Sequence, residues 1–280
     1  MPAGSLYIVA TPIGNLEDIT LRALRVLKEV DMIAVEDTRH SRILLNHYGI
    51  VTPLTSYHEH NEKTKTRQII GRLIQGNNIA LVSDAGTPTI SDPGYRLVVE
   101  AIRSGIQVVP VPGACALTAV LSAGGLPTDR FVFEGFLPAK RKERRARLHT
   151  LRGEGRTLLF YEAPHRLRET LNDLIEMLGD REIVVAREVS KVHEEFLRGR
   201  LSEAIEQIAD REIKGELTLL VGGAPESSEV SQDQIHAEIH KLKNQGMRVK
   251  DIAEILGEKY GYSKKEIYRI ALAAGGETTT

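Results

Sequence analysis

Short apolar runs alternate with amphipathic stretches along residues 6–221 of the chain. Residues 6–10 (Leu-Tyr-Ile-Val-Ala) and 78–82 (Asn-Ile-Ala-Leu-Val) are apolar and border small or turn-forming residues, which is typical of strands buried on both faces. Between such runs the apolar residues recur at helical spacing, as at Leu21, Leu24 and Leu27. Strands that alternate with helices at short intervals predict a mostly parallel sheet covered on both faces.

The same pattern predicts two α/β domains. Strands are predicted at residues 6–10, 32–35, 78–82, 107–110, 130–136, 156–161, 182–186, 194–198 and 216–221. Helices are predicted after Asp18 or Thr20 as a cap, at 66–74, after Pro93-Gly94, at 115–123 and after Pro164. A boundary near Pro112 separates an N-terminal domain of residues 1–112, with the mostly parallel sheet, from a second, mixed α/β domain of residues 113–224.

The pattern changes after residues 222–228, a stretch of glycine, proline and serine that is typical of a linker. Strand-like runs end there, and Gly261-Tyr262-Ser263 predicts a turn with Ser263 as a helix cap. Residues 231–275 are therefore predicted to form a small helical module, resembling a helix-turn-helix. It is either a packing appendage or a nucleic-acid contact made by its cations Lys250, Lys259, Lys264, Lys265 and Arg269. Residues 275–280 are expected to be a frayed tail.

Composition indicates an ordinary globular protein. The 280 residues are 41% hydrophobic and 27% charged with a formal net charge of -1, so the chain can bury a large core and its bulk charge does not indicate a nucleic-acid partner. The single cysteine, Cys115, excludes an internal disulfide. No apolar run reaches the ~18 residues of a membrane span, and the N-terminus does not resemble a leader. A cytoplasmic protein without a membrane partner is expected.

The sequence lacks the common signatures of nucleotide and hydrolase sites. No Gly-x-Gly-x-x-Gly follows the first strand, and no Gly-Lys-Ser/Thr, His-Glu-x-x-His or Gly-x-Ser-x-Gly occurs. An ordinary Rossmann enzyme and a P-loop NTPase are thereby disfavoured. His58-Glu59-His60 offers too few ligands for a metal site, so no metal is expected.

Residues 81–94 contain the most informative stretch, in which a buried strand passes through small residues, two prolines and two aspartates into a helix. Open α/β sheets bind ligands at such carboxyl ends of strands. Gly86 lets a ligand approach the backbone, and Asp84 offers a hydrogen-bond acceptor. The alternative is a connecting loop in which Asp92 caps the helix. Similar loops follow other strands and together predict a groove lined mainly by backbone, at residues 11–16, 84–88, 111–116, 135 and 162–164.

Several of these loops carry longer motifs. Ala-Thr-Pro-Ile-Gly-Asn-Leu-Glu-Asp-Ile-Thr at residues 10–20, Glu-Asp-Thr-Arg at 36–39, the loop at 83–94, Val-Pro-Gly at 111–113 and Phe-Tyr-Glu-Ala-Pro-His-Arg at 160–166 are specific. With these motifs, residues 5–223 resemble the bacterial 16S ribosomal RNA cytidine 2'-O-methyltransferases of the tetrapyrrole methylase superfamily. The resemblance extends more loosely to the helical tail.

The resemblance implies a two-domain tetrapyrrole-methylase-like fold, a homodimer, and S-adenosylmethionine bound between the domains. Thr87 stands where the wider superfamily has the aspartate of a Gly-Asp-Pro motif. The resemblance therefore implies that the backbone of this loop holds the cofactor, but it implies no carboxylate at position 87. Asp84 is a partial substitute for that carboxylate. The implied cofactor-binding residues are Pro12, Gly14, Asp84, Gly86, Thr87, Ala116, Leu117, Tyr161, Ala163 and Pro164.

A ribose hydroxyl needs a base to accept its proton, and six acidic or histidine side chains are candidates: Glu36, Asp37, His58, Glu59, Glu162 and His165. Among them Glu36 and Asp37, with Arg39, are favoured as the acceptor-side wall of the active site. The alternatives are a structural ion-pair cluster around Asp37 and a helix cap at Glu162.

RNA binding needs local cations, since the bulk charge is close to neutral. Residues 140–147 are basic apart from Glu143 and Ala146, which favours a phosphate-contacting helix over an ordinary solvated face. The proposed contacts are Arg141, Lys142, Arg144 and Arg145, and the implied partner is 16S rRNA within the small ribosomal subunit. A tetrapyrrole methyltransferase and a non-catalytic nucleic-acid-binding regulator remain alternative functions.

Overall fold

The computed structural model describes residues 2–225, 232–260 and 262–273. The chain divides into two compact units, Met1–Gly223 and Ala224–Thr280. The first unit contains two five-stranded sheets, and the second contains three helices.

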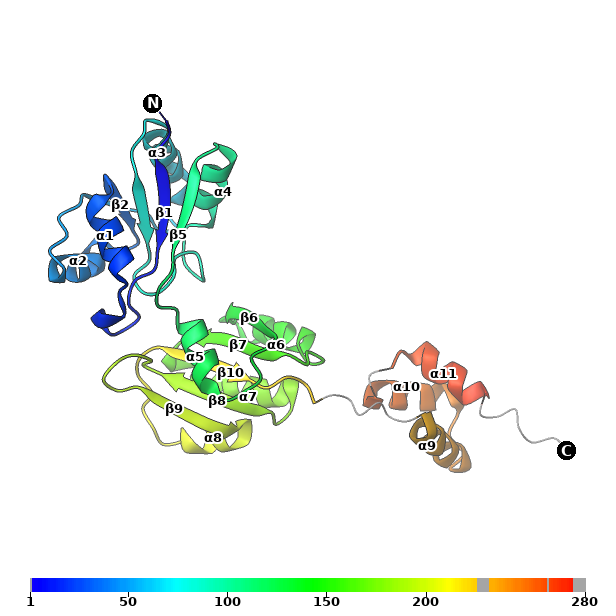
Figure 1. Ribbon diagram of the computed structural model, residues 1–280. Helices are drawn as coiled ribbons and strands as arrows, with labels where there is room; N and C mark the ends of the chain where they lie inside the picture. Colours follow the sequence, from blue (N-terminus) through cyan, green and yellow to red (C-terminus); the bar gives the residue numbers. More distant parts are fainter. Residues whose placement is uncertain (1, 226–231, 261, 274–280) are drawn as a thin grey trace. The chain divides into compact units, whose positions relative to one another are not determined.

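The first sheet is entirely parallel. Its strands lie in the order β3-β2-β4-β1-β5 and comprise β1 (Ser5–Val9), β2 (Met32–Val35), β3 (Leu54–Ser56), β4 (Ile79–Val82) and β5 (Gln107–Val111). Every residue of β2 and β4 is buried, as expected of central strands with helices on both faces. Apolar residues of α1 (Leu21–Glu29) and α2 (Thr38–His47) pack on one face, and those of α3 (Glu62–Ile74) and α4 (Tyr95–Arg103) pack on the other (Figure 1).

The second sheet is mixed. Its strands lie in the order β6-β7-β10-β8-β9, and only the β6–β7 pair is parallel. They comprise β6 (Phe131–Phe136), β7 (Thr157–Glu162), β8 (Glu182–Arg187), β9 (Glu195–Arg200) and β10 (Leu217–Val221). One face packs against α5 (Ala116–Gly124), and the other packs against α6 (Arg141–Thr150), α7 (Leu167–Leu178) and α8 (Leu201–Gln207). Two short 3₁₀ turns, η1 (Leu16–Asp18) and η2 (Pro164–Arg166), precede α1 and α7.

The second unit is a helical module of α9 (Gln232–Asn244), α10 (Val249–Tyr260) and α11 (Lys264–Ala273). Ile239, Ile252 and Ile267 form part of its small core. Ser263 and Glu266 cap α11 reciprocally, since the Glu266 amide donates to Ser263 Oγ at 3.2 Å and the Ser263 amide donates to the Glu266 carboxylate at 2.9 Å.

The predicted fold class, a parallel sheet followed by a mixed α/β sheet and a helical module, is confirmed. Thr20 rather than Asp18 caps α1, because its hydroxyl accepts from the Ala23 amide at 3.1 Å. The domain boundary at Pro112 stays a prediction, and the predicted tail at 275–280 lies outside the described residues. Among the described helices, none is long and apolar enough to cross a bilayer.

Candidate cofactor and active site

The loops that follow β1 and β4 are joined at the carboxyl edge of the first sheet. Because β1 and β4 are neighbours, the chain leaves both strands at the same place. The Thr11 amide donates to the Gly86 carbonyl at 2.8 Å, and the Gly86 amide donates back to the Thr11 carbonyl at 3.0 Å. The Thr11 hydroxyl also donates to the Ser83 carbonyl at 3.3 Å. Residues 11–16 and 83–94 therefore form one rigid rim.

A cavity of about 400 Å³, here called the cofactor cavity, lies beside this rim. Its walls come from the loop after β4, the start of α5, the end of β7, and residues 215–218 at the start of β10. Seven of the predicted cofactor residues line it: Asp84, Gly86, Thr87, Ala116, Tyr161, Ala163 and Pro164. The fold thus gathers loops separated by more than 70 residues into one pocket, as a cofactor site on this sheet edge requires.

Three predicted cofactor residues lie elsewhere. Pro12 and Gly14 line an adjoining cavity, here called the side cavity, while the neighbouring Ile13 contacts both cavities. Leu117 lies on α5 with 9% of its surface exposed and packs against the second sheet. Leu117 lines neither cavity, because helical periodicity turns it toward the core while Ala116 faces the cofactor cavity.

Gly86 and Thr87 have distinct structural roles in the rim. Gly86 has φ +80°, a conformation that side chains disfavour, and a Cβ there would lie 3.3 Å from Ile13 Cγ2. Thr87 Oγ1 donates to the Ala114 carbonyl at 3.2 Å, which links the loop after β4 to the turn before α5. The position at which the superfamily has an aspartate is thus used here to join two walls of the cofactor cavity.

Burial and neighbouring charges raise the proton affinity of two carboxylates at this edge, Asp92 and Glu36. Burial, followed by proximity to Asp84, raises the pKa of Asp92 to about 6. Burial and the charges of Asp84, Asp92 and Asp37 also raise the pKa of Glu36. Asp84 is held in place by the Asp37 amide, which donates to its carboxylate at 3.1 Å.

Asp92 was expected to cap the following helix only in the alternative in which residues 81–94 form a connecting loop. It is not a cap, because α4 begins after Gly94 and has no side-chain cap. Asp92 instead lines the cofactor cavity. The signal available in the sequence was a second aspartate in the same small-residue loop as Asp84.

Asp37 and Arg39 form a local ion pair, the alternative left open above. Asp37 caps α2 by accepting from the Arg39 amide at 2.8 Å, and its carboxylate also pairs with the Arg39 guanidinium at 2.8 Å. These hydrogen bonds lower the pKa of Asp37 to about 2, which makes it a weak base. The Arg39 side chain is 90% exposed. Neither these two residues nor Glu36 lines the cofactor cavity.

Glu162 lines the cofactor cavity, but its oxygens are already held by neighbouring groups. The carboxylate is buried and accepts from the Arg166 guanidinium at 2.6 Å and from the Thr170 hydroxyl at 2.6 Å. The Ala163 amide donates to it at 2.8 Å. Glu162 therefore fixes the start of α7 and is a poor candidate for a proton acceptor.

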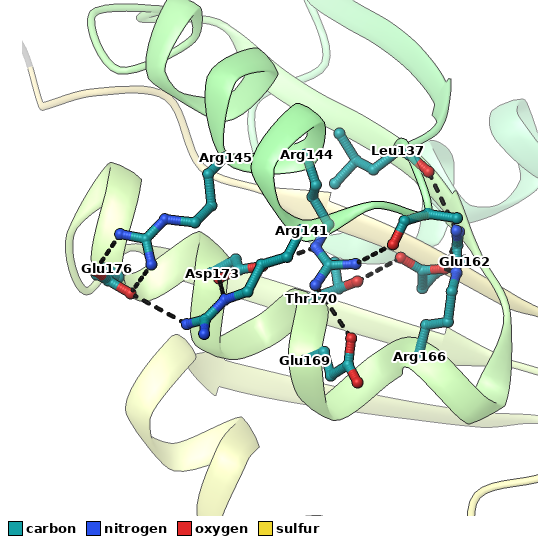
Figure 2. A network of polar contacts seen from close by, with 11 residues as sticks. Leu137, Arg141, Arg144, Arg145, Glu162, Arg166, Glu169, Thr170, Asp173 and Glu176 are labelled. Atoms are coloured by element: carbon teal, nitrogen blue, oxygen red, sulfur yellow. Dashed lines mark hydrogen bonds and ion pairs between the residues drawn. The ribbon is translucent and has the colours of Figure 1, made fainter.

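Arginines of the basic run on α6 form ion pairs within the protein (Figure 2). Burial corrects the predicted RNA contact of Arg144, whereas those of Arg141, Lys142 and Arg145 stay predictions. Arg144 is completely buried, pairs with Asp173 at 2.8 Å and Glu169 at 3.2 Å, and cannot reach a phosphate. Arg141 pairs with Asp173, and Arg145 pairs with Glu176. The acidic partners of these three arginines all lie on α7, more than 20 residues further along the chain, so the run appeared unneutralised in the sequence. Lys142 stays exposed on the surface of α6.

The fold and the sequence comparisons place this protein in a class of methyltransferases. Residues 5–205 match the family described as tetrapyrrole (corrin/porphyrin) methylases, and the chain belongs to this family. A protein of Halalkalibacterium halodurans named ribosomal RNA small subunit methyltransferase I is 49% identical over 273 residues, which cover 95% of this chain and 94% of the relative.

A second relative and a solved structure add to this comparison. A Thermotoga maritima protein of the same name is 51% identical over 220 residues, which cover 79% of this chain and 99% of the relative. The crystal structure of uroporphyrin-III C-methyl transferase from Thermus thermophilus, complexed with S-adenyl homocysteine, shares the fold with a TM-score of 0.54. That similarity covers 78% of this chain and 97% of the Thermus chain at 22% identity.

Proposed function

We propose that this protein transfers a methyl group from S-adenosylmethionine to the 2'-oxygen of a cytidine in 16S rRNA of the small ribosomal subunit. The observation that carries the proposal is the cofactor cavity, which is walled by loops at the carboxyl edge of the parallel sheet and shared with the second sheet. The names of the relatives support an rRNA substrate, and the resemblance noted in the sequence motifs supports the cytidine and its 2'-oxygen.

The residues of the cofactor cavity fit the adenosyl cofactor. Gly86 leaves the backbone bare where a Cβ would contact Ile13, so a ligand can lie against the main chain. Asp84 offers an acceptor for hydroxyl and amino groups, and the aromatic ring of Tyr161 offers an apolar wall. When bound, S-adenosylmethionine supplies an electrophilic methyl group whose C–S bond breaks as the new C–O bond forms, with the electron pair left on sulfur.

Asp92 is the residue that we assign as proton acceptor for the ribose hydroxyl. Its carboxylate lines the cofactor cavity, and a pKa of about 6 makes it both ionised near neutral pH and more basic than an ordinary aspartate. The proton of the hydroxyl moves to the carboxylate as the oxygen is methylated. The backbone amide of Asp37 holds the Asp84 carboxylate in place. Together with burial, the negative charge of Asp84 raises the pKa of Asp92.

The direct test is methyl transfer from labelled cofactor to small subunits taken from cells that lack this protein. The proposal expects label in 16S rRNA at the 2'-oxygen of one cytidine, located by mapping the modified nucleotide. Label transferred to a tetrapyrrole and not to RNA would establish the alternative function, that of a tetrapyrrole methyltransferase. If calorimetry detects no binding of S-adenosylmethionine, the protein is a non-catalytic regulator. The predicted homodimer is tested separately by light scattering.

A further inference from the structure

The side cavity adjoins the cofactor cavity. It has a volume of about 240 Å³ and is lined by the loop after β1, by α2 and by the end of β4. Four residues line both cavities: Ile13, Asp84, Ala85 and Glu216. A molecule in the side cavity therefore lies next to whatever occupies the cofactor cavity.

One buried polar group in the side cavity lacks a partner. Ser41 lies on α2 with 5% of its surface exposed, and its Oγ makes no hydrogen bond within the described part of the chain. A buried hydroxyl without a partner is unfavourable, and most buried polar groups in proteins are paired. A donor or acceptor on a bound molecule would satisfy it.

The remaining walls indicate the chemistry of that molecule. Pro12, Leu16 and Leu44 offer apolar surfaces, while His40 and Asp84 supply polar groups at the cavity wall. Lys191 also lines it, with its ammonium held by Glu188 at 2.8 Å and Glu216 at 3.2 Å. The volume is below the roughly 300–1,000 Å³ of sites for larger ligands, so the cavity suits one planar ring with apolar faces and a polar edge.

We propose that the side cavity receives the base of the target nucleotide, with Ser41 Oγ hydrogen-bonded to its polar edge. This assignment rests on the proposed function and specifies how the acceptor is held. Methyl transfer needs donor and acceptor in line and about 3 Å apart, which demands an acceptor site that adjoins the cofactor cavity. Enzymes that do chemistry on a base extrude the nucleotide and read the base by hydrogen bonds and by stacking between apolar side chains. The proposal extends this mode of holding to a nucleotide that is methylated on its ribose.

The test compares Ser41→Ala and Ser41→Leu with the matched control Asn46→Ala, which removes an exposed side chain from the same helix outside both cavities. Ser41→Ala removes the hydroxyl, and we expect kcat/KM for unmodified small subunits to fall roughly three- to ten-fold, the worth of one hydrogen bond. Ser41→Leu fills the cavity, and we expect transfer to fall below that of Ser41→Ala. S-adenosylmethionine affinity, measured by calorimetry, should stay at the wild-type value in all three variants and show that each is folded.

A second readout is base selectivity. Subunits that carry uridine in place of the target cytidine should be poorer substrates for the wild type, and Ser41→Ala should narrow this difference. The assignment is overturned if Ser41→Ala keeps both wild-type transfer and wild-type selectivity. It is also overturned if Ser41→Ala weakens cofactor binding as much as transfer, because the side cavity would then belong to the cofactor. A wild-type protein that methylates no subunit RNA refutes the proposed function itself, and with it this assignment.

Discussion

Asp92 differs from an ordinary surface aspartate because the fold places it beside Asp84 in a partly buried loop. If it accepts the ribose proton, Asp92→Asn should lower kcat by about 10²–10⁴-fold while S-adenosylmethionine affinity changes little. The wild-type rate should rise as pH increases through about 6, where the carboxylate ionises. The residual rate of the variant should lack this rise. A pH profile of single-turnover transfer checks both points, and an unchanged acid limb in the variant would exclude Asp92.

The same residue predicts a pH dependence of stability. The pKa of Asp92 in the folded protein, about 6, is above the 3.8 of an unperturbed aspartate, so between these pH values the folded state holds a proton that the unfolded chain has already released. Its contribution is therefore present below about pH 4 and is lost as pH rises through 6. Asp92→Asn should raise Tm relative to the wild type at pH 7.5, and the difference should shrink toward pH 4. Thermal unfolding across this range measures it; a pH-independent difference would contradict the assigned pKa.

Arg144 belongs to the stability of the second sheet and not to RNA binding. Arg144→Leu leaves the carboxylate of Asp173, 1% exposed, with only the partly exposed Arg141 as a charged partner. We expect a loss of about 3–5 kcal/mol of unfolding free energy, typical of a broken buried pair. Arg145→Ala, which removes a more exposed pair with Glu176, should cost about 1 kcal/mol or less. Urea unfolding measures both, and equal effects of the two substitutions would contradict the buried network.

At the scale of elements, the rim of the cofactor cavity depends on a left-handed residue. Gly86→Ala and Gly125→Ala both introduce a Cβ at positive φ, at +80° and +89°, which costs about 1–2 kcal/mol. Only the Cβ at position 86 meets a neighbour, Ile13, whereas nothing lies within 4 Å at position 125. We therefore expect similar losses of stability but weaker S-adenosylmethionine binding only in Gly86→Ala. Calorimetry distinguishes the two variants, and equal affinities of both for S-adenosylmethionine would show that the rim does not shape the cofactor cavity.

The sequence predicted the elements whose apolar pattern is continuous and missed those whose pattern is broken. Buried strands such as β4 were recognisable because every residue is apolar. By contrast, β3 has three residues, and α2 begins in a dense polar cluster, so neither has enough apolar periodicity to be recognised. The cavity loops after β4, β5 and β7 were predictable because each follows a strand, whereas residues 215–218 begin β10 and were not predicted. The pairing of α6 with α7 was not, because ion pairs between distant segments leave no local signal.

At the scale of the whole molecule, the cations that are available to contact RNA differ from those expected from the sequence. Once the basic run of α6 is paired with α7, the helical module becomes the better candidate for RNA contact. Two of its lysines are also paired, Lys259 with Glu238 and Lys264 with Glu254. On α11 the exposed residues Lys265, Tyr268 and Arg269 are one helical turn apart and share a face. Cations beside an aromatic ring suit contact with phosphates and bases.

The module is therefore expected to add RNA affinity to a catalytic unit that does not need it for cofactor binding. In the full chain, Lys265→Ala with Arg269→Ala should weaken small-subunit binding and reduce the slope of log affinity against log salt by about 2, one for each phosphate contact. Lys259→Ala removes a cation already paired with Glu238 and serves as the matched control. S-adenosylmethionine binding should be the same in all variants, since the described residues that line the cofactor cavity belong to the first unit. A variant that has lost phosphate contacts releases fewer counterions when it binds RNA, so its salt slope must be smaller than that of the wild type. Identical slopes for the wild type and the double variant would therefore assign the module a packing role.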